Sequence, residues 1–380
     1  MKKNRINSKA RISICLVSAF AFVFGCNVSG QDEIFANGDS VAVMTWNVQT
    51  LFDDVEDGSE YADYSMLSGW TAEKYLGRLN VISAAVRGME RKPDIIALQE
   101  VESAKVIGDL AAALADYGWT HFASIPGMAL GVGLLSRFPL SDMKAHSVTV
   151  FGDTAPRPML EARVNVPTAE GGDLPAIIFV CHWKSKLGGE DVTESTRRAS
   201  ARIIVRRMRE LLKTEPDLPV IITGDLNLNH DEFYRRNGSV ISALLPDDPR
   251  SAELTGLYGL DEEDSGIFAQ VGELQKDFII VSKNKPPLTR YFPSAAVSVY
   301  TPWSTELQNG SYVYRNSWET IDHFLLSVQL FDGIGLEYDT CMVLNAPPFA
   351  NASGYPSAYN PRTGFGMSDH LPLFMILKVR

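Results

Sequence analysis

The stretch that constrains the fold most is residues 218–229, which read LPVIITGDLNLN. Its β-branched core at 220–222 is continuous, as is typical of a strand buried on both faces of a sheet. The apolar run stops at Gly224, and Asp225 and Asn227 follow at once. Because these two residues are two positions apart, an extended chain places them on the same side. Polar side chains at the end of a buried strand are where α/β proteins place chemistry, although an ordinary Asx turn leaves the same pattern.

Apolar runs typical of strands recur along the chain, and segments with the apolar spacing of helices lie between the first of them. The expected strands are 41–46, 94–98, 131–136, 159–166, 176–181, 220–222, 278–281, 311–315, 321–327 and 371–377. Strands and helices alternate early, and strands dominate late. The pattern predicts an α/β (α+β) fold, a four-layer sandwich of two packed mixed β-sheets flanked by helices.

Three helices and one hairpin are expected between these strands. A helix at 71–89 presents an apolar face made of Leu76, Leu79, Ile82 and Val86. Ser103 can cap a second helix, and Thr193 can start a third that reaches Leu212. Asn309 and Gly310 form a dipeptide that favours a hairpin turn.

The first segment has the layout of a secretory signal. Residues 1–11 carry five basic residues and no acid, and residues 12–24 are almost wholly apolar before Gly25 and Cys26. The end of this segment resembles a bacterial lipoprotein cleavage box, which predicts a lipid anchor at Cys26 in the cell envelope. Simple secretion, or release into a periplasm, is the alternative. The expected segments are a signal peptide at 1–25, a tether at 26–40 and a folded domain at 41–380.

The charge of the chain limits its partners. Removing the five basic residues of the signal takes the formal net charge from −11 to −16. With such an acidic body, nothing in the charge indicates a general electrostatic coat for nucleic acid. A phosphate-binding site would therefore need a local cationic patch or a metal ion.

Polar residues of catalytic type lie at the edges of several apolar runs. The set comprises Asn47, Glu100, His182, Asp225, Asn227, Asp322, Asp369 and His370. Three of the six histidines, His182, His323 and His370, lie at such edges. A single buried Asp or His is usually a satisfied structural group, but the repeated coincidence of residue type and position indicates a site of chemistry.

These segments resemble the endonuclease/exonuclease/phosphatase superfamily, the deoxyribonuclease I-like metal-dependent phosphoesterases. The matching segments follow the family's order and span nearly the whole chain after Val41: TWNVQTLFD, DIIALQEVE, GVGLLSRFPL, CHWKSK, ITGDLNLN, WETIDHFLLS and SDHLPLFMIL. Each is weakly specific alone, whereas the combination is highly specific. The segment GSYVYRNSWETIDH resembles a branch of exported bacterial members.

The resemblance implies a divalent ion, Mg²⁺ with Mn²⁺ or Ca²⁺ as alternatives, bound mainly by Glu100. Asn47 would support that ion or a phosphate oxygen, and Asp369 would contribute to the metal side. A hard cation held by one or two carboxylates is the usual Mg²⁺ arrangement. Gln49 stands where some members have a metal-binding Asp, which weakens the case for a second metal.

The resemblance also implies roles in catalysis. Asp225 would orient or deprotonate the attacking water, and Asn227 would hold the phosphate. His370, oriented by the carboxylate of Asp322, would contact the phosphate, and His182 would contact it or assist the leaving group. In-line displacement at phosphorus needs this kind of positioning and charge neutralisation.

Some assignments have plain alternatives. Arg157 and Lys184 are the expected cationic anchors for the substrate, but a loop arginine and a solvated lysine fit the same positions. Asp322 and Asp369 could be ordinary strand-end turn residues, with His323 rather than His370 facing the site.

Three functions compete. The leading one is an exported metal-dependent phosphodiester hydrolase, a nuclease acting on nucleic acid. The second is a lipid or sugar phosphoesterase that resembles a sphingomyelinase, and the third is a catalytically inactive lipoprotein that only binds. The complete polar set argues against the third function, and the acidic body argues mildly against tight non-specific DNA binding. The sequence points to no protein partner.

Overall fold

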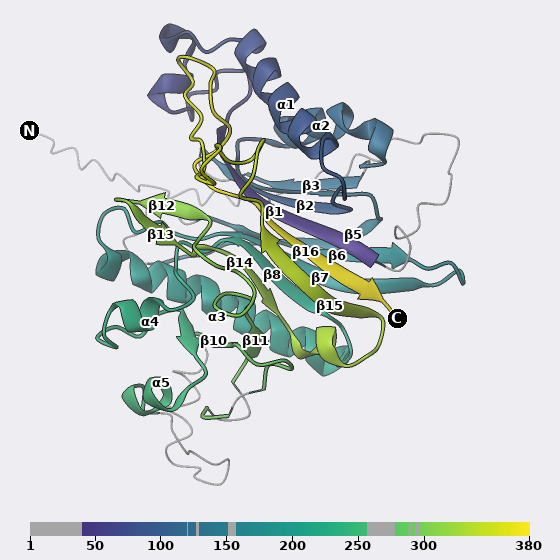
Figure 1. Ribbon diagram of the computed structural model, residues 1–380, viewed down its shortest axis with the longest axis vertical. Helices are drawn as coiled ribbons and strands as arrows, with labels where there is room; N and C mark the ends of the chain where they lie inside the picture. The colour runs from purple at the N-terminus through teal and green to yellow at the C-terminus, as the bar shows by residue number, and fades with distance from the viewer. Residues whose placement is uncertain are drawn as a thin grey trace, which may run out of the picture.

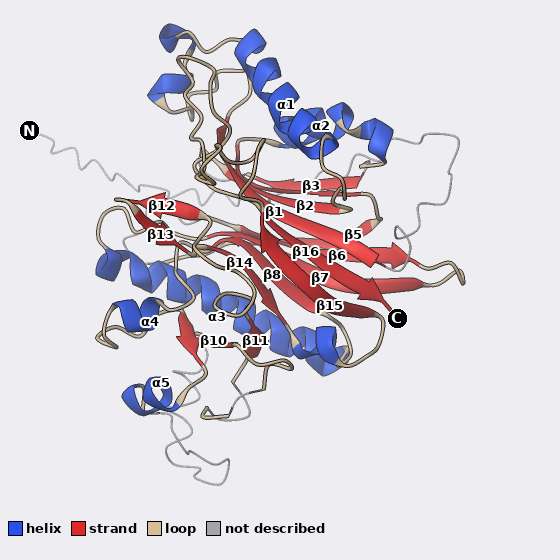
Figure 2. Cartoon of the chain, viewed as in Figure 1, coloured by secondary structure: helices blue, strands red, loops and turns tan. Residues whose placement is uncertain are grey.

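The computed structural model describes residues 40–119, 121–126, 129–150, 157–256, 278–288, 290–292 and 296–380. The expected signal peptide, Cys26 and all but the last residue of the expected tether lie outside the described residues. Two large β-sheets stack face to face with helices outside them (Figures 1 and 2). None of the helices in the described part of the chain has both the length and the apolar character needed to span a bilayer.

Six strands form the first sheet: β1 (Ser40–Leu51), β2 (Ile95–Val101), β3 (His121–Ile125), β4 (Gly131–Ser136), β15 (Leu336–Val343) and β16 (Leu373–Val379). Their order across the sheet is β15-β16-β1-β2-β4-β3. β1 runs parallel to β2 and antiparallel to β16, so the sheet is mixed.

Eight strands form the second sheet: β5 (Leu140–His146), β6 (Met159–Pro167), β7 (Asp173–His182), β8 (Val220–Asp225), β9 (Leu244–Pro246), β10 (Ile279–Ser282), β11 (Ser298–Tyr300) and β14 (Asp322–Leu326). Their order is β5-β6-β7-β8-β14-β11-β10-β9. β8 is parallel to β7 and antiparallel to β14, which makes this sheet mixed as well. A separate hairpin pairs β12 (Tyr312–Tyr314) with β13 (Ser317–Glu319).

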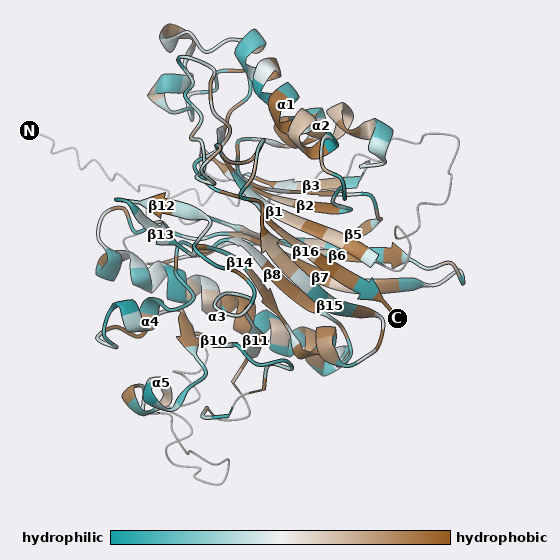
Figure 3. Ribbon diagram, in the orientation of Figure 1, coloured by the Kyte–Doolittle hydropathy of each residue, from teal (hydrophilic) through white to brown (hydrophobic). Residues whose placement is uncertain are grey.

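The α-helices are α1 (Ala72–Arg87), α2 (Ala104–Ala113), α3 (Glu190–Thr214), α4 (Glu232–Arg235) and α5 (Pro249–Leu254). Short 3-10 helices occur at Ala62–Tyr64, Met66–Ser68, Ala115–Tyr117 and Val328–Phe331. In Figure 3 the central strands are hydrophobic over most of their length, whereas α3 carries both hydrophobic and hydrophilic segments.

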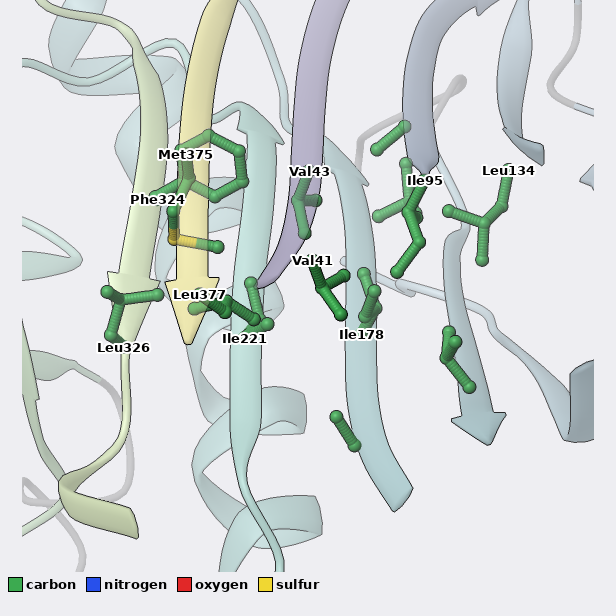
Figure 4. Packing of buried hydrophobic residues seen from close by; sticks show 14 of the residues in the cluster. Val41, Val43, Ile95, Leu134, Ile178, Ile221, Phe324, Leu326, Met375 and Leu377 are labelled. Carbon is green, nitrogen blue, oxygen red and sulfur yellow. The ribbon is translucent and has the colours of Figure 1, made fainter. Parts of the chain in front are cut away.

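The alternation of side chains along the strands builds the layers. On β1, Val41 and Val43 belong to the core between the two sheets (Figure 4), whereas Ala42 and Met44 pack in the cluster that contains α1 and α2. This division follows from the two-residue period of a strand, which sends neighbouring side chains to opposite faces.

The second sheet is covered in the same way. On β8, Ile221 belongs to the inter-sheet core, and Val220 and Ile222 pack with the apolar face of α3. The prediction of a strand buried on both faces is confirmed. The predicted four-layer sandwich of two mixed sheets flanked by helices is confirmed with it.

The predicted apolar face of α1 was wrong at Leu76, which is 55% exposed. The buried face runs instead through Tyr75, Leu79, Ile82 and Val86, at spacings that share one side of a helix. Leu76 is one residue on from Tyr75, a rotation of about 100°, which carries it away from the sheet.

The predicted start of α3 at Thr193 was also wrong, because the helix begins at Glu190. Gly189, with φ of 116°, ends the preceding loop, and the Thr193 hydroxyl donates to the Gly189 carbonyl at 2.8 Å. Thr193 therefore lies in the first turn and does not cap it. By contrast, Ser103 caps α2 as expected, since its hydroxyl accepts from the Val106 N–H.

The predicted hairpin turn lies elsewhere than expected. The two residues that join β12 to β13 are Arg315 and Asn316, with φ of 48° and 65°. Two successive left-handed residues are what a tight hairpin of this hand requires. Gly310 serves another purpose, because a Cβ on it would lie 2.4 Å from the Glu319 carbonyl oxygen.

Candidate active site

Strand ends from both sheets meet at one edge of the sandwich, on the side where β12 and β13 lie in Figure 1. The first sheet brings Asn47 on β1 and Glu100 on β2 to this edge. The second sheet brings His182 at the end of β7, Asp225 at the end of β8 and Asp322 at the start of β14. The strand register pairs Asp225 with both His182 and Asp322, so these three residues must lie side by side.

The Asp225 carboxylate lies at the centre of this group. Its Oδ2 accepts from Asn47 Nδ2 at 3.1 Å and lies 3.6 Å from His182 Nε2 and 4.0 Å from His370 Nε2. The backbone N–H of Asn227 donates to Oδ1 at 2.9 Å. Burial raises the pKa of Asp225 to about 7, with the nearby Asp322 charge adding to the rise and His370 opposing it.

His370 and Asp322 form a buried pair. His370 Nδ1 lies 2.8 Å from Asp322 Oδ2, which leaves Nε2 facing Asp225. Burial opposes a charge on this imidazole, but the Asp322 carboxylate outweighs burial and raises the pKa of His370 to about 10. His323 points elsewhere: its Nε2 bonds to the Leu228 carbonyl at 2.8 Å, and burial lowers its pKa to about 4. The geometry therefore places His370, not His323, at the site.

His182 is buried and uncharged. Burial, the Arg157 guanidinium and the His370 charge hold its pKa well below the usual range. Arg157 contacts His182 Nε2 and donates to the Trp183 carbonyl at 3.2 Å. The structure thus brings Arg157 to the site, where its guanidinium can meet an anionic substrate.

Glu100 faces Asp225 from the first sheet. It has φ of 61°, a conformation that non-glycine residues rarely adopt and that is often found at functional sites. Its Oε2 accepts from the Thr50 N–H at 2.8 Å, and its Oε1 lies 3.3 Å from Asn47 Nδ2. Its side chain is 20% exposed, and within the described ranges no Lys or Arg forms an ion pair with it.

The donor set fits a hard divalent cation. Glu100 and Asp369 are close enough for the Glu100 charge to contribute, with burial as the larger cause, to a raised pKa of Asp369. Asn47 turns its amide nitrogen to Glu100 and Asp225, and its Oδ1 accepts from the Gln49 N–H at 3.0 Å. Carboxylate and amide oxygens are the ligands that Mg²⁺ and Ca²⁺ take.

A second acidic and histidine group lies beside these residues. One atom each of Asp225, Asp322 and His370 lie within 4.8 Å of one another, as metal ligands do. In this group His370 directs Nδ1 to Asp322, so Nε2 is the ring nitrogen left to face Asp225. The expected metal site at Glu100 stays a prediction.

A sequence model of the endonuclease/exonuclease/phosphatase family matches residues 41–291, which is more than half of the chain. The chain belongs to the endonuclease/exonuclease/phosphatase family. The match includes Asn47, Glu100, His182, Asp225 and Asn227. The remaining site residues, on β14 and before β16, lie beyond it and are brought to the site by the fold.

Solved structures of this family are similar over most of the chain. A member from Beutenbergia cavernae is 14% identical with a TM-score of 0.46, covering 90% of this chain and 72% of its own. A member from Bacteroides thetaiotaomicron is 15% identical with a TM-score of 0.46, covering 90% and 98%. Truncated TDP2 from Caenorhabditis elegans is 14% identical with a TM-score of 0.47, covering 90% and 98%. No curated protein sequence gives a significant match to the chain.

Asn227 and Lys184, two further residues predicted to contact substrate, make protein contacts in the structure. The Asn227 amide donates to the Trp183 carbonyl at 3.1 Å, so in this structure it ties the end of β8 to the end of β7. Its contact with phosphate stays a prediction. Lys184 follows His182 by two residues, and its carbonyl accepts from Arg197 at 3.0 Å. The structure assigns no substrate contact to the Lys184 ammonium.

Gln49 and Arg78 support the site in a way that the sequence did not reveal. The Gln49 amide bonds to the backbone of Tyr359 and accepts from the Asp369 N–H at 3.1 Å. Buried Arg78 donates to the carbonyls of Val48, Gln49 and Met367, and its guanidinium lies 3.6 Å from the centre of the Tyr359 ring. These two side chains hold the segment that carries Asp369 and His370 against β1. The only sequence signal was an arginine one position from an apolar helical face.

The arrangement suits hydrolysis at phosphorus. Family membership places the chain among phosphoester hydrolases, and the site holds one carboxylate of raised pKa between a cationic and a neutral imidazole. Asp225 can take a proton from water near neutral pH, because general bases work best with a pKa near the working pH. His370 and Arg157 can face the negative charge that develops on the phosphoryl oxygens.

Proposed function

We propose that the chain is an exported, metal-dependent phosphodiester hydrolase, and specifically a nuclease. The observation that supports this most is the position of Asp225, within 4.0 Å of both His182 and His370 and facing Glu100 across the edge of the two sheets. Acid–base groups and a carboxylate that could bind a hard cation converge there, and Arg157 supplies a cation beside them.

Each side chain then has a defined task. Asp225 orients the attacking water and accepts its proton. The imidazolium of His370, fixed by Asp322, donates through Nε2 to a phosphoryl oxygen. His182, neutral and in contact with Arg157, donates or accepts at the leaving-group side. A divalent ion held by Glu100, Asn47 and Asp369 would polarise the phosphoryl oxygen and lower the pKa of a bound water.

A panel of phosphoesters tests this proposal. Plasmid DNA, RNA, sphingomyelin vesicles and bis(p-nitrophenyl) phosphate are each incubated with Mg²⁺ or with EDTA, and Asp225→Asn serves as the matched inactive variant. We expect hydrolysis of a nucleic acid and of the chromogenic diester that EDTA and Asp225→Asn both abolish. Hydrolysis of none of the four, or hydrolysis that persists in Asp225→Asn, overturns the proposal.

A second candidate, a lipid phosphoesterase, is favoured by exposed apolar side chains on three connections at the site edge. Leu67 lies after β1, Leu187 after β7 and Phe365 before β16, with exposed fractions of 98%, 87% and 78%. Such side chains can enter a lipid surface. Cleavage of sphingomyelin vesicles without cleavage of nucleic acid would select this candidate.

We also propose that the protein is exported and held in the cell envelope by a lipid anchor. The basic and apolar segment at residues 1–24, followed by Cys26, supports export and a lipid anchor. One acyl chain anchors a protein only weakly, so stable retention requires more than one.

A further inference from the structure

The base of the β12–β13 hairpin reaches the His370–Asp322 pair. Ser311, which precedes β12, is fully buried, and its hydroxyl donates to Asp322 Oδ2 at 2.6 Å. This is the same oxygen that lies 2.8 Å from His370 Nδ1. The other carboxylate oxygen, Asp322 Oδ1, is buried with no hydrogen-bond partner in the described part of the protein.

The backbone fixes Ser311 from two sides. Its N–H donates to the Glu319 carbonyl at 3.0 Å, and its carbonyl accepts from the Leu371 N–H at 2.7 Å. Gly310 allows the close approach to Glu319 that this requires, since a Cβ there would clash. Ser311 is thus held between the hairpin and the residue that follows His370, so its hydroxyl has little freedom to move.

Tyr312, the next residue, covers the imidazole. It forms an isolated antiparallel bridge with His370, which places the two side chains on the same face. The two ring centres are 4.6 Å apart with an angle of 31° between the rings. The Tyr312 ring therefore limits rotation of His370 about its side-chain bonds.

We propose that Ser311 and Tyr312 are positioning residues that fix the orientation of His370, Ser311 through the Asp322 carboxylate and Tyr312 by ring packing. The Ser311 hydroxyl and His370 Nδ1 both contact Asp322 Oδ2, and Oδ1 has no partner among the described residues, so the Ser311 hydroxyl helps to hold Oδ2 in place for His370. His370 then keeps Nδ1 on Asp322 and Nε2 toward the substrate. The part of this inference that concerns rate rests on the proposed function.

Kinetics on bis(p-nitrophenyl) phosphate test the inference at Ser311. We expect Ser311→Ala to lower kcat about ten-fold, the lower end of what supporting residues contribute, with KM unchanged within about two-fold because Ser311 does not touch substrate. Ser311→Thr, which keeps the hydroxyl, should recover most of this loss. In the His370→Ala background, Ser311→Ala should cause no further loss. The matched control is Ser200→Ala on α3, a buried hydroxyl whose hydrogen bond within the described residues goes to the Thr196 carbonyl of its own helix.

Tyr312 gives an independent test at a half-buried position. Tyr312→Leu should lower kcat, and Tyr312→Phe should recover most of the loss because the ring is kept. Tyr314→Leu, two residues further along the hairpin and 50% exposed, is the control. An unchanged kcat in both Ser311→Ala and Tyr312→Leu, or a loss confined to KM, overturns the inference.

A readout that needs no activity separates this inference from the proposed function. In ¹⁵N-histidine-labelled protein, the His370 Nδ1 proton bonded to Asp322 should give a low-field signal that His370→Ala removes. Ser311→Ala should broaden or shift that signal, and Ser200→Ala should not. If wild type hydrolyses no phosphoester but the signal responds in this way, the proposed function fails and the positioning role stands. A signal unaffected by Ser311→Ala overturns the positioning role.

Discussion

Glu161 on β6 offers a quantitative test of how the sandwich is held to α3. Its side chain is fully buried, and it accepts from Arg207 Nε at 2.8 Å and Nη2 at 2.9 Å and lies 2.7 Å from His146 Nε2. Burial alone would raise the pKa of this carboxyl, but hydrogen bonds from His146 and Arg207 outweigh it and lower the pKa from 4.5 to about 2. That difference corresponds to about 3 kcal/mol of folding free energy at neutral pH.

The sign of the pH dependence follows. Because the carboxylate is stabilised in the folded state, its contribution is fully present above pH 4.5 and is lost as the pH falls toward 2. We expect Glu161→Gln to lower the free energy of unfolding at pH 7 by about 3 kcal/mol. The difference from wild type should narrow by about 1 kcal/mol at pH 3.5. Urea unfolding at the two pH values measures both quantities.

Glu215→Gln is the matched control for this experiment. Glu215 also meets an arginine through both oxygens, at 2.6 and 3.1 Å from Arg163, but its side chain is 46% exposed. An exposed ion pair contributes less than about 1 kcal/mol. Equal losses for Glu161→Gln and Glu215→Gln, or a Glu161→Gln loss that is the same at pH 7 and pH 3.5, would refute the reasoning.

Three further predictions concern the site and the location. Asp322→Asn should lower activity by roughly a hundred-fold and His370→Ala by at least as much. The double variant Asp322→Asn/His370→Ala should lose little more activity than the worse single variant, and His323→Ala should lower activity only mildly. The pairing is contradicted if the two single losses multiply in the double variant, or if His323→Ala lowers activity more than His370→Ala. Arg78→Met should lower the free energy of unfolding by about 2–4 kcal/mol in a urea titration, because it strips three backbone carbonyls of their donor; a loss under about 1 kcal/mol contradicts this. Cys26→Ser should release the bacterially expressed protein into the aqueous phase of a Triton X-114 partition or leave it unprocessed at its full length; equal partition of wild type and a processed variant would count against the anchor.

The sequence predicted well those features that depend on neighbouring residues. The continuous β-branched run of β8 predicted a strand buried on both faces, and the run at 41–46 predicted β1 as a strand, because both signals lie in neighbouring residues. The serine cap of α2 was predicted for the same reason. The end of an apolar run also indicated where Glu100, His182 and Asp225 would meet.

Features that depend on distant segments were missed or misplaced. β3, β5 and β15 were not predicted, because their partly exposed sequences carry no clear strand pattern of their own. They form strands by pairing with β4, β6 and β16. The hairpin turn at Arg315 and Asn316 carries no glycine, so the Asn309-Gly310 dipeptide was the stronger local signal.

The same reason explains the site residues that were overlooked. Arg78 bonds to Met367, 289 positions further along the chain, and Gln49 bonds to Asp369, 320 positions further along. Ser311 acts through Asp322 on His370. No local pattern records such contacts. The pairing of Asp322 with His370 was predicted from the family resemblance. In the structure, Asp322 Oδ2 lies 2.8 Å from His370 Nδ1.

The most direct test of the central claim is Mg²⁺ binding to Glu100, measured by isothermal titration calorimetry beside hydrolysis of the preferred phosphoester. Glu100→Gln keeps the shape of the side chain and removes its charge, and exposed Glu90→Gln is the control for the loss of one carboxylate. The account predicts that wild type and Glu90→Gln bind Mg²⁺ and hydrolyse the substrate alike. In Glu100→Gln, Mg²⁺ binding should be strongly weakened and activity should fall by about 10²-fold or more. Unchanged Mg²⁺ binding together with full activity in Glu100→Gln would contradict it.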